Sequence, residues 1–231
     1  MARGYPDYSN SQDTWDVTVR TTTLPRVGKV YGVDNFESPL WKWEDAGDAG
    51  YTAQLTVANA YEGPSCMYLK PNAADDDEVY AFRRWPLPEE NRVAIAFVFA
   101  VDGDAYGEIR LDFNYRDGTD HYTGAIQWIE GDHWQYRDNA GAWQDITGGA
   151  QEFIHDWHAF NEFVLIFDKI LHQYVYLVVN HQFMDLTGIE LQRPGGSSVS
   201  VLYTEIMNIA DEDDNVWELW IDNFTVAEVK E

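Results

Sequence analysis

The 231-residue sequence predicts an all-β protein that folds as a sandwich of two antiparallel sheets. Apolar and polar residues alternate over many short segments, which is the pattern of strands that bury one face. About a dozen such segments follow one another at the spacing of about eight to twelve residues found in sandwiches. The ten Trp, fourteen Tyr and eleven Phe favour the same class, because aromatic side chains fit pleated, half-buried surfaces.

The strand predicted at Val216–Val229 organises the rest of the fold. Its apolar positions have period two up to Asp222, and their parity changes after Asn223, so we expect a β-bulge there. Asp34-Asn35-Phe36 repeats the pattern of Asp222-Asn223-Phe224. This similarity predicts that the first and last strands lie side by side and that both Phe side chains are buried.

The centre of the chain gives the clearest strand patterns. Val93–Val101 is apolar on both faces, which predicts a strand in the middle of a sheet. Ile109–Arg116 alternates strictly and ends in the hairpin signal Asp117-Gly118. Only residues 151–161 could hold a helical turn. The other predicted strands cover residues 51–58, 65–70, 79–85, 122–128, 134–136, 143–146, 163–167, 174–179, 183–186 and 199–206.

Residues 1–30 differ in composition from residues 31–231, which form the predicted sandwich domain. The first segment is polar and contains Pro6 and Pro25, and it has no apolar core of the length that a signal peptide needs. We expect it to be an extended arm that contacts another subunit, either a second copy of the chain or another protein of an assembly made in the cytoplasm.

The charge excludes several classes of partner. The net charge of −25 and the isoelectric point near 4.3 exclude nucleic acid, because phosphate binding needs clusters of Lys and Arg. They also argue against an anionic membrane surface, and no stretch is apolar enough to span a bilayer. Cys66 is the single cysteine, so no internal disulfide is expected.

The order of these elements resembles the concanavalin-A-like (laminin-G-like) jelly roll over roughly residues 31–229. The matching pieces are Asp34-Asn35-Phe36, Trp157-His158, Asp168, Tyr174–Asn180 and Trp220–Phe224. The resemblance implies a two-sheet antiparallel jelly roll, a fold that hosts lectins, hydrolases and structural modules alike. The opening Met1–Tyr8 is similar to the N-termini of some tailed-bacteriophage structural proteins.

No carboxylate pair with the spacing of a glycosidase site lies on one strand. Glu108 and Asp112 share a strand face but lie about 13 Å apart, and Glu218 and Asp222 have the same spacing. Retaining glycosidases need about 5–5.5 Å between carboxyl groups and inverting ones about 6.5–9.5 Å. We therefore expect no enzymatic activity, although carboxylates from different strands could still meet.

Two kinds of metal site are considered. His155 and His158 share one face of a helical turn but have no visible third ligand, so a polar turn is the favoured interpretation. Acidic loops are candidates for calcium, which binds several oxygen ligands, although most such loops are simply solvated. The candidate calcium ligands are Asp102, Asp104, Asp211, Asp213 and Asp214.

Four aromatic residues on consecutive hairpins are candidates for a contact surface: Trp128, Trp134, Tyr136 and Trp143. Their rings could stack on a sugar or form a protein interface, and the alternative is that they fill the core.

The leading functional hypothesis is a non-enzymatic virion structural protein of a tailed phage, a capsid decoration or a tail or fibre component. It would act through subunit contacts and surface glycan attachment. The alternative is a carbohydrate-binding, lectin-like module, and a glycoside hydrolase or lyase comes third.

Overall fold

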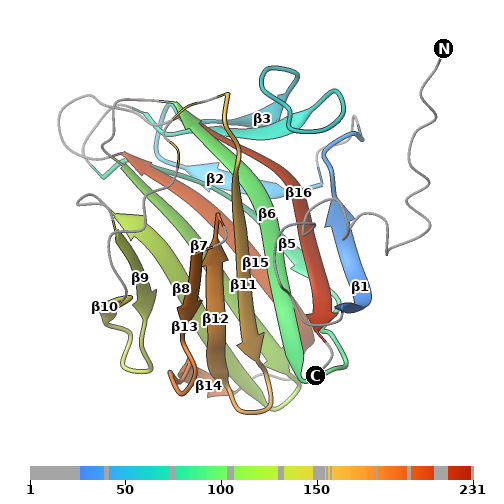
Figure 1. Ribbon diagram of the computed structural model, residues 1–231, viewed down its shortest axis with the longest axis vertical. Helices are drawn as coiled ribbons and strands as arrows, with labels where there is room; N and C mark the ends of the chain where they lie inside the picture. The colour runs from blue at the N-terminus through green and yellow to red at the C-terminus, as the bar shows by residue number, and fades with distance from the viewer. Residues whose placement is uncertain are drawn as a thin grey trace.

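The computed structural model describes residues 27–38, 42–72, 76–102, 107–129, 133–147, 154, 156, 158–180, 182–196, 199–210 and 218–229. Within these residues, sixteen strands form two antiparallel sheets of eight strands, packed face to face as a sandwich (Figure 1). The fold class is as predicted. Over the same residues, no helix is long and apolar enough to cross a membrane.

The first sheet, sheet A, contains the chain's two similar ends. Its strand order is β13 (Gln182–Asp185), β12 (Gln173–Val179), β11 (Asn161–Asp168), β6 (Arg92–Asp102), β16 (Glu218–Val229), β4 (Cys66–Lys70) and β3 (Thr52–Thr56). The remaining strand, β1 (Val27–Asp34), pairs with the C-terminal half of β16, while β4 pairs with its N-terminal half.

The second sheet, sheet B, carries the candidate site. Its order is β10 (Trp143–Asp145), β9 (His133–Arg137), β8 (Asp120–Ile129), β7 (Gly107–Asp117), β15 (Ser200–Ala210), β5 (Glu78–Trp85) and β2 (Glu44–Gly47). β14 (Gln192–Gly196) also pairs with β8, at the end of β8 that β9 leaves free.

The predicted bulge and the predicted pairing of the two ends are both confirmed. The register of β16 against β6 shifts between Asp222 and Thr225, and Asn223 has a φ of 52°. Asp34 lies opposite Phe224 in the β1–β16 pair. Phe224 is fully buried and Phe36 is 2% exposed. The extra residue at Asn223 changes which face the following side chains occupy, and this brings Phe224 into the core.

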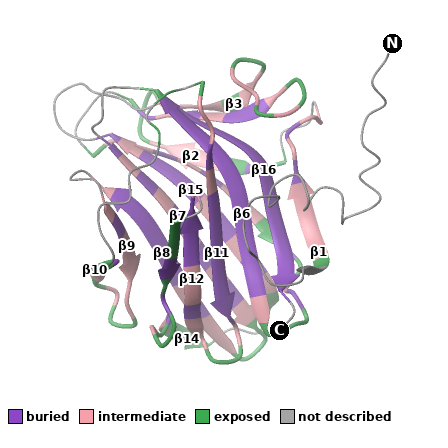
Figure 2. Ribbon diagram, in the orientation of Figure 1, coloured by how far each residue is buried: buried purple, intermediate pink, exposed green. Residues whose placement is uncertain are grey.

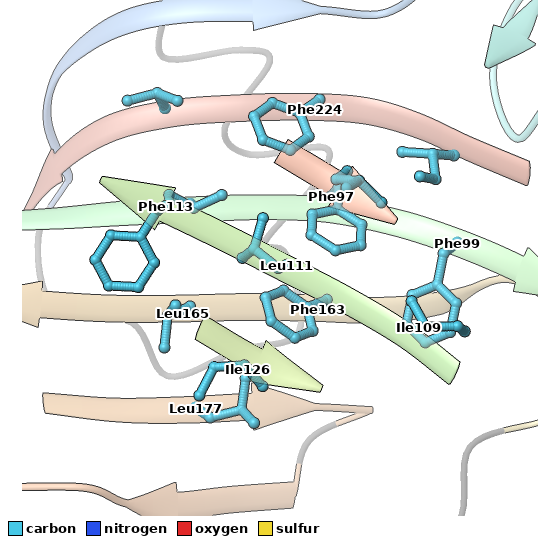
Figure 3. Close-up of a cluster of buried hydrophobic side chains, with 14 of the residues drawn as sticks. Phe97, Phe99, Ile109, Leu111, Phe113, Ile126, Phe163, Leu165, Leu177 and Phe224 are labelled. Carbon is cyan, nitrogen blue, oxygen red and sulfur yellow. The ribbon is translucent and has the colours of Figure 1, made fainter. Parts of the chain in front are cut away.

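Aromatic side chains fill the core between the two sheets (Figure 3). The Phe97 ring stacks against Phe163 at 4.6 Å and against Phe224 at 5.6 Å, and the Phe113 ring of sheet B stacks on Phe167 of sheet A at 4.5 Å. β6, the predicted central strand, is buried on both faces over residues 93–101 and lies between β11 and β16 (Figure 2).

Asp222 is a fully buried carboxylate beside the bulge. Its Oδ2 accepts hydrogen bonds from the backbone N–H groups of Tyr61 and Glu62 at 3.1 Å each, and its Oδ1 accepts one from Asn223 N–H. Burial raises the pKa of Asp222 to about 7, and the three hydrogen bonds oppose this shift. The side chain thus fastens the loop that follows β3 to the last strand.

The domain begins slightly earlier than expected, because β1 starts at Val27 instead of near residue 31. Residues 1–26 lie outside the described residues, so the predicted arm and its contacts with another subunit stay a prediction.

Candidate functional site

The outer face of sheet B carries polar side chains at positions set by the strand alternation. On β7 the inner residues Ile109, Leu111, Phe113 and Tyr115 are buried, while the outer residues Arg110, Asp112, Asn114 and Arg116 are partly exposed. The neighbouring strands place their own outer residues beside these at fixed register positions. Asp112 lies opposite Glu205 of β15 on one side and Ala125 of β8 on the other.

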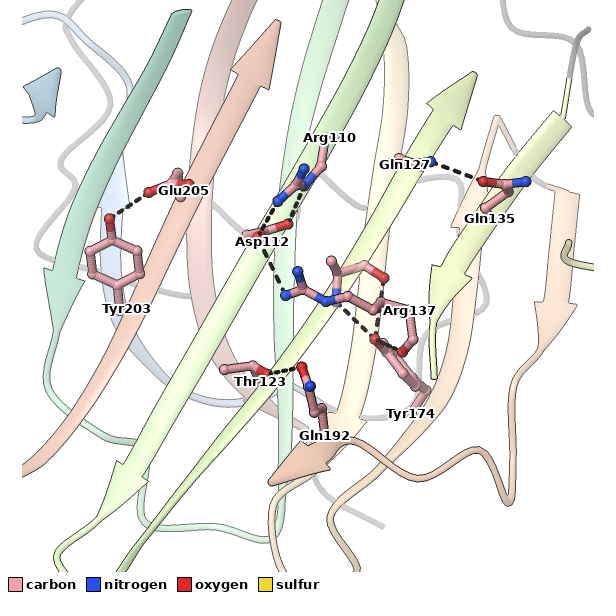
Figure 4. A network of polar contacts seen from close by, with 11 residues as sticks. Arg110, Asp112, Thr123, Gln127, Gln135, Arg137, Tyr174, Gln192, Tyr203 and Glu205 are labelled. Carbon is pink, nitrogen blue, oxygen red and sulfur yellow. Dashed lines mark hydrogen bonds and ion pairs between the residues drawn. The ribbon is translucent and has the colours of Figure 1, made fainter. Parts of the chain in front are cut away.

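A charged network occupies the middle of this face (Figure 4). Arg110 donates to both oxygens of Asp112, from Nε at 2.7 Å and from Nη2 at 2.9 Å, and Arg137 Nη2 donates to Asp112 Oδ2 at 3.4 Å. The hydrogen bonds to Asp112 raise the pKa of Arg110. Both guanidinium groups lie near the Trp143 ring of β10, at 5.5 and 5.7 Å from its centre. Two arginines and one aromatic ring are thus held around one carboxylate.

Amide and hydroxyl groups extend the polar network across β8, β9, β10 and β14, and all of them except the buried Gln127 are partly or fully exposed. Gln127 Nε2 donates to Gln135 Oε1 at 2.9 Å, and Gln135 Nε2 donates to Asp145 Oδ1 at 2.8 Å. Thr123 Oγ1 donates to Gln192 Oε1 at 3.3 Å. These groups both donate and accept hydrogen bonds, which is what a ligand rich in hydroxyl groups requires.

Aromatic rings lie on the β5 and β15 side of the same face. Tyr80, Phe82 and Tyr203 form a row of partly exposed rings, with centres 6.2 Å apart for the first pair and 5.4 Å for the second. Tyr203 donates its hydroxyl proton to Glu205 Oε2 at 2.6 Å. Burial is the main cause that raises the pKa of Glu205, and the nearby Asp112 adds to it.

Tyr174 supports this face from the other sheet. Its hydroxyl accepts a hydrogen bond from Ala125 N–H at 2.8 Å and lies 3.2 Å from the Ala125 carbonyl and 3.0 Å from the Arg137 carbonyl (Figure 4). β9 pairs with β8 only from Ile126 onwards, and β14 pairs with it only up to Thr123. Neither strand therefore pairs with the backbone N–H and C=O groups of Ala125 at this edge of β8, and the Tyr174 hydroxyl binds them instead.

The four aromatic residues predicted to form a contact surface do not lie together on one surface. Trp128 and Trp134 are 1% and 2% exposed, and their rings belong to the core, which is the alternative that the sequence left open. Tyr136 packs against that core, 6.1 Å from the Tyr174 ring. Trp143 lies on the outer face, beside the two arginines. Its contact with a ligand stays a prediction.

The structure describes only some of the candidate metal ligands, and calcium binding stays a prediction. Asp102 is exposed at the end of β6, whereas Asp104, Asp211, Asp213 and Asp214 lie outside the described residues. His155 is also outside them, and His158 Nδ1 lies within hydrogen-bonding distance of Asp156 Oδ1, at 3.1 Å. Within the described part of the chain, no group of three or more His, Cys, Asp or Glu side chains could hold a metal ion.

Several residues of this face were not identified from the sequence as site residues: Arg110, Arg137, Tyr203 and Glu205. The alternation over residues 109–116 was visible, and it showed that Arg110 and Asp112 share an outer face. The structure also brings Asp112 and Glu205 to facing positions on neighbouring strands, so carboxyl groups of different strands do meet here. The sequence had left this possibility open.

No protein-family model matches the chain, and no curated protein sequence matches it significantly. Solved structures do resemble it. A galectin-like protein of unknown function from Bacillus subtilis has a TM-score of 0.57 and 10% identity, covering 90% of this chain and 100% of its own. An endo-β-1,4-glucuronan lyase from the fungus Trichoderma reesei has a TM-score of 0.59 and 9% identity, covering 87% and 96%. The carbohydrate recognition domain of Emp46p, in a potassium-bound form, has a TM-score of 0.55 and 12% identity, covering 89% and 100%. At these identities the likeness shows the fold alone, a jelly-roll sandwich of the galectin-like, concanavalin-A-like class.

Proposed function

We propose that the protein is a carbohydrate-binding, lectin-like module and that it holds an oligosaccharide on the outer face of sheet B. The proposal rests on one observation, that aromatic rings and polar side chains occur together on that face. Partly exposed rings lie on β5, β15 and β10, and a network of arginine, carboxylate and amide groups lies between them.

A sugar ring presents both of the chemistries that such a face would recognise. Its C–H groups pack on aromatic rings, and its hydroxyl groups exchange hydrogen bonds with Arg, Asp, Asn and Gln side chains. Trp143 lies on the β9 side of Asp112 and Tyr203 on its β15 side, so a sugar chain lying along β7 has an aromatic ring on each flank. The Emp46p domain and the glucuronan lyase show that this fold serves carbohydrate ligands in other proteins. This likeness supports the proposal, but the proposal rests on the side chains of this face.

We expect binding without turnover. Both oxygens of Asp112 accept hydrogen bonds from guanidinium groups, which lowers the reactivity of this carboxylate as a nucleophile or base. Glu205, the facing carboxyl group, is bonded to Tyr203. Incubation with neutral and acidic polysaccharides should therefore release no reducing ends. Turnover that disappears in Glu205→Gln would overturn this part of the proposal.

A glycan array followed by isothermal titration calorimetry tests the binding. Trp143→Ala should weaken the affinity for the best array ligand about tenfold, since a stacked aromatic ring contributes roughly 0.5–1.5 kcal/mol beyond its buried area. Phe183→Ala is the matched control, because this ring is 60% exposed on β13 of sheet A, away from the site. Equal loss in both variants, or no binding to any glycan, would refute the assignment.

The virion structural role stays a prediction. The segment that motivated it, residues 1–30, lies almost entirely outside the described residues, and the structural similarities concern the sandwich alone. The molar mass in solution of the full chain, compared with a chain lacking residues 1–26, tests whether this segment joins subunits. A monomer in both cases would remove the assembly argument.

A further inference from the structure

Positive charge gathers on one half of the outer face of sheet B, although the whole chain has a net charge of −25. This half consists of the outer residues of β7 from Arg110 to Arg116, those of β8 from His121 to Gln127, and Arg137 of β9. It contains three arginines and one carboxylate, Asp112, which gives +3 − 1 = +2 with neutral histidine. We call these four side chains, Arg110, Asp112, Arg116 and Arg137, the arginine strip.

Three carboxylates border the strip, so its positive charge is local: Asp145 of β10, Glu205 of β15, and Glu108, the next outer residue of β7. Asp145 accepts a hydrogen bond from Gln135 and contacts His133, and these contacts lower its pKa, so Asp145 keeps its negative charge at the exposed end of β10. On the β15 side, burial raises the pKa of Glu205, whose Oε2 accepts a hydrogen bond from the Tyr203 hydroxyl. The pKa of His121 is lowered by burial and by Arg116, so His121 adds no charge at neutral pH.

The protein itself leaves part of the strip's hydrogen-bonding capacity unused. Among the described residues, no partner is found for the buried Nε atoms of Arg116 and Arg137, or for the buried Nε2 of His121, which lies opposite Arg116 in the β7–β8 register. The hydrogen bond of the Arg137 side chain, to Asp112, is long at 3.4 Å. A guanidinium group has five N–H donors, so each of these arginines has more donors than the protein pairs, and a ligand can reach those at the partly exposed part of the side chain.

The geometry of the strip points to carboxylate groups on the ligand. Arg110 and Arg137 share one carboxylate, and their side chains are 22% and 20% exposed, so a ligand can reach them. A guanidinium group presents a planar fork of N–H donors that matches a carboxylate in a bidentate arrangement. The Trp143 ring beside both groups offers an apolar surface for the sugar ring that bears such a carboxylate.

We propose that the saccharide bound on this face is acidic, a chain of uronic acid residues whose carboxylates bind the arginine strip. This inference rests on the proposed carbohydrate-binding function and specifies its ligand. Arg110 and Arg116 lie six residues apart on one strand, about 20 Å at 3.3 Å per residue. An oligosaccharide of several residues lying along β7 therefore meets both arginines, with Arg137 between them.

Calorimetry with a matched pair of ligands tests the charge directly. The probes are the tetramers of galacturonate, mannuronate and glucuronate, each compared with its own fully methyl-esterified form. The wild-type protein should bind at least one free acid about tenfold or more tightly than its methyl ester, because each charged hydrogen bond contributes roughly 1.5–3 kcal/mol, equivalent to tenfold or more. This comparison needs no variant, so it does not depend on how a variant folds.

Variants then locate the binding. Arg116→Gln and Arg137→Gln should each reduce the affinity for the acid about tenfold, and Arg137→Lys should keep part of it, since the charge stays and the fork is lost. The control is Arg84→Gln, an exposed arginine at an outer position of β5 opposite Tyr203, which should change the affinity less than twofold.

The outcomes separate this inference from the function on which it rests. Equal affinity for acid and methyl ester, or binding of neutral oligosaccharides alone, overturns the acidic ligand and leaves the carbohydrate-binding function standing. Absence of binding to any saccharide, charged or neutral, overturns both. An equal loss in Arg84→Gln and Arg137→Gln overturns the placement on the strip.

Discussion

Replacing Tyr174 by Phe should destabilise the protein at the junction that supports the candidate site. The hydroxyl group accepts from Ala125 N–H and donates toward the carbonyls of Ala125 and Arg137, at distances of 2.8, 3.2 and 3.0 Å. Ala125 is fully buried, so water cannot replace these partners without opening the sheet. The Phe ring keeps the edge-to-face contact with Phe113, whose ring centre lies 6.0 Å away.

The expected loss follows from the groups left without partners. A buried donor whose acceptor is removed costs about 1–3 kcal/mol, and a typical hydrogen bond contributes a net 0.5–1.5 kcal/mol or so. One orphaned N–H and one lost donation to a carbonyl give a decrease of roughly 2–4 kcal/mol in the free energy of unfolding. The midpoint of urea denaturation, with an unchanged slope, measures it.

Tyr176→Phe on the same strand is the matched control. The Tyr176 hydroxyl is buried, and among the described residues no hydrogen-bond partner is found for it. Its removal should leave stability within about 0.5 kcal/mol of the wild type, or raise it. Hydrogen exchange adds a local readout, since the Ala125 amide should exchange faster only in Tyr174→Phe. A Tyr174→Phe protein as stable as Tyr176→Phe, with Ala125 still protected, would show that the hydroxyl does not complete the sheet.

Three further predictions address the core, the buried acid and activity. Phe224→Ala should lower the free energy of unfolding by about 3–5 kcal/mol, because it empties the space between Phe97 and Trp85, and a loss below 1 kcal/mol would contradict this packing. The pKa of Asp222 is raised to about 7 by burial, so the folded protein holds this proton up to a higher pH than the unfolded chain does. Stability should therefore decline as pH rises from about 4 to 7, by as much as roughly 4 kcal/mol, and Asp222→Asn should remove that part of the decline in parallel denaturation curves. If both proteins follow the same pH curve, the buried carboxyl group does not titrate as inferred. Finally, no reducing ends or unsaturated products should appear when the protein is incubated with β-glucans, alginate or chitin, and turnover lost on removing one carboxylate would contradict a binding role.

The class of fold and its main strands could be predicted because their signals are local. Alternation with period two identified β7 and β16 from their own residues, and the change of parity at Asn223 located the bulge without any knowledge of partners. The repeated Asp-Asn-Phe pattern also predicted a contact between distant segments, the pairing of β1 with β16. Apolar residues on both faces placed Val93–Val101 in the interior of a sheet.

The candidate site was decided by the tertiary structure. Trp128, Trp134 and Trp143 look alike in the sequence, yet the first two face the core and the third lies over Arg110 and Arg137. Strand order and register decide which side chains lie opposite one another, and both arise from pairing between segments far apart in the chain. Asp112 thus meets Glu205 on one side and Arg137 on the other. The sequence by itself determined that β7 has a polar outer face, because alternation is a property of one strand. What that face binds depends on its neighbours, because a site built across several strands exists only when long-range pairing has aligned them.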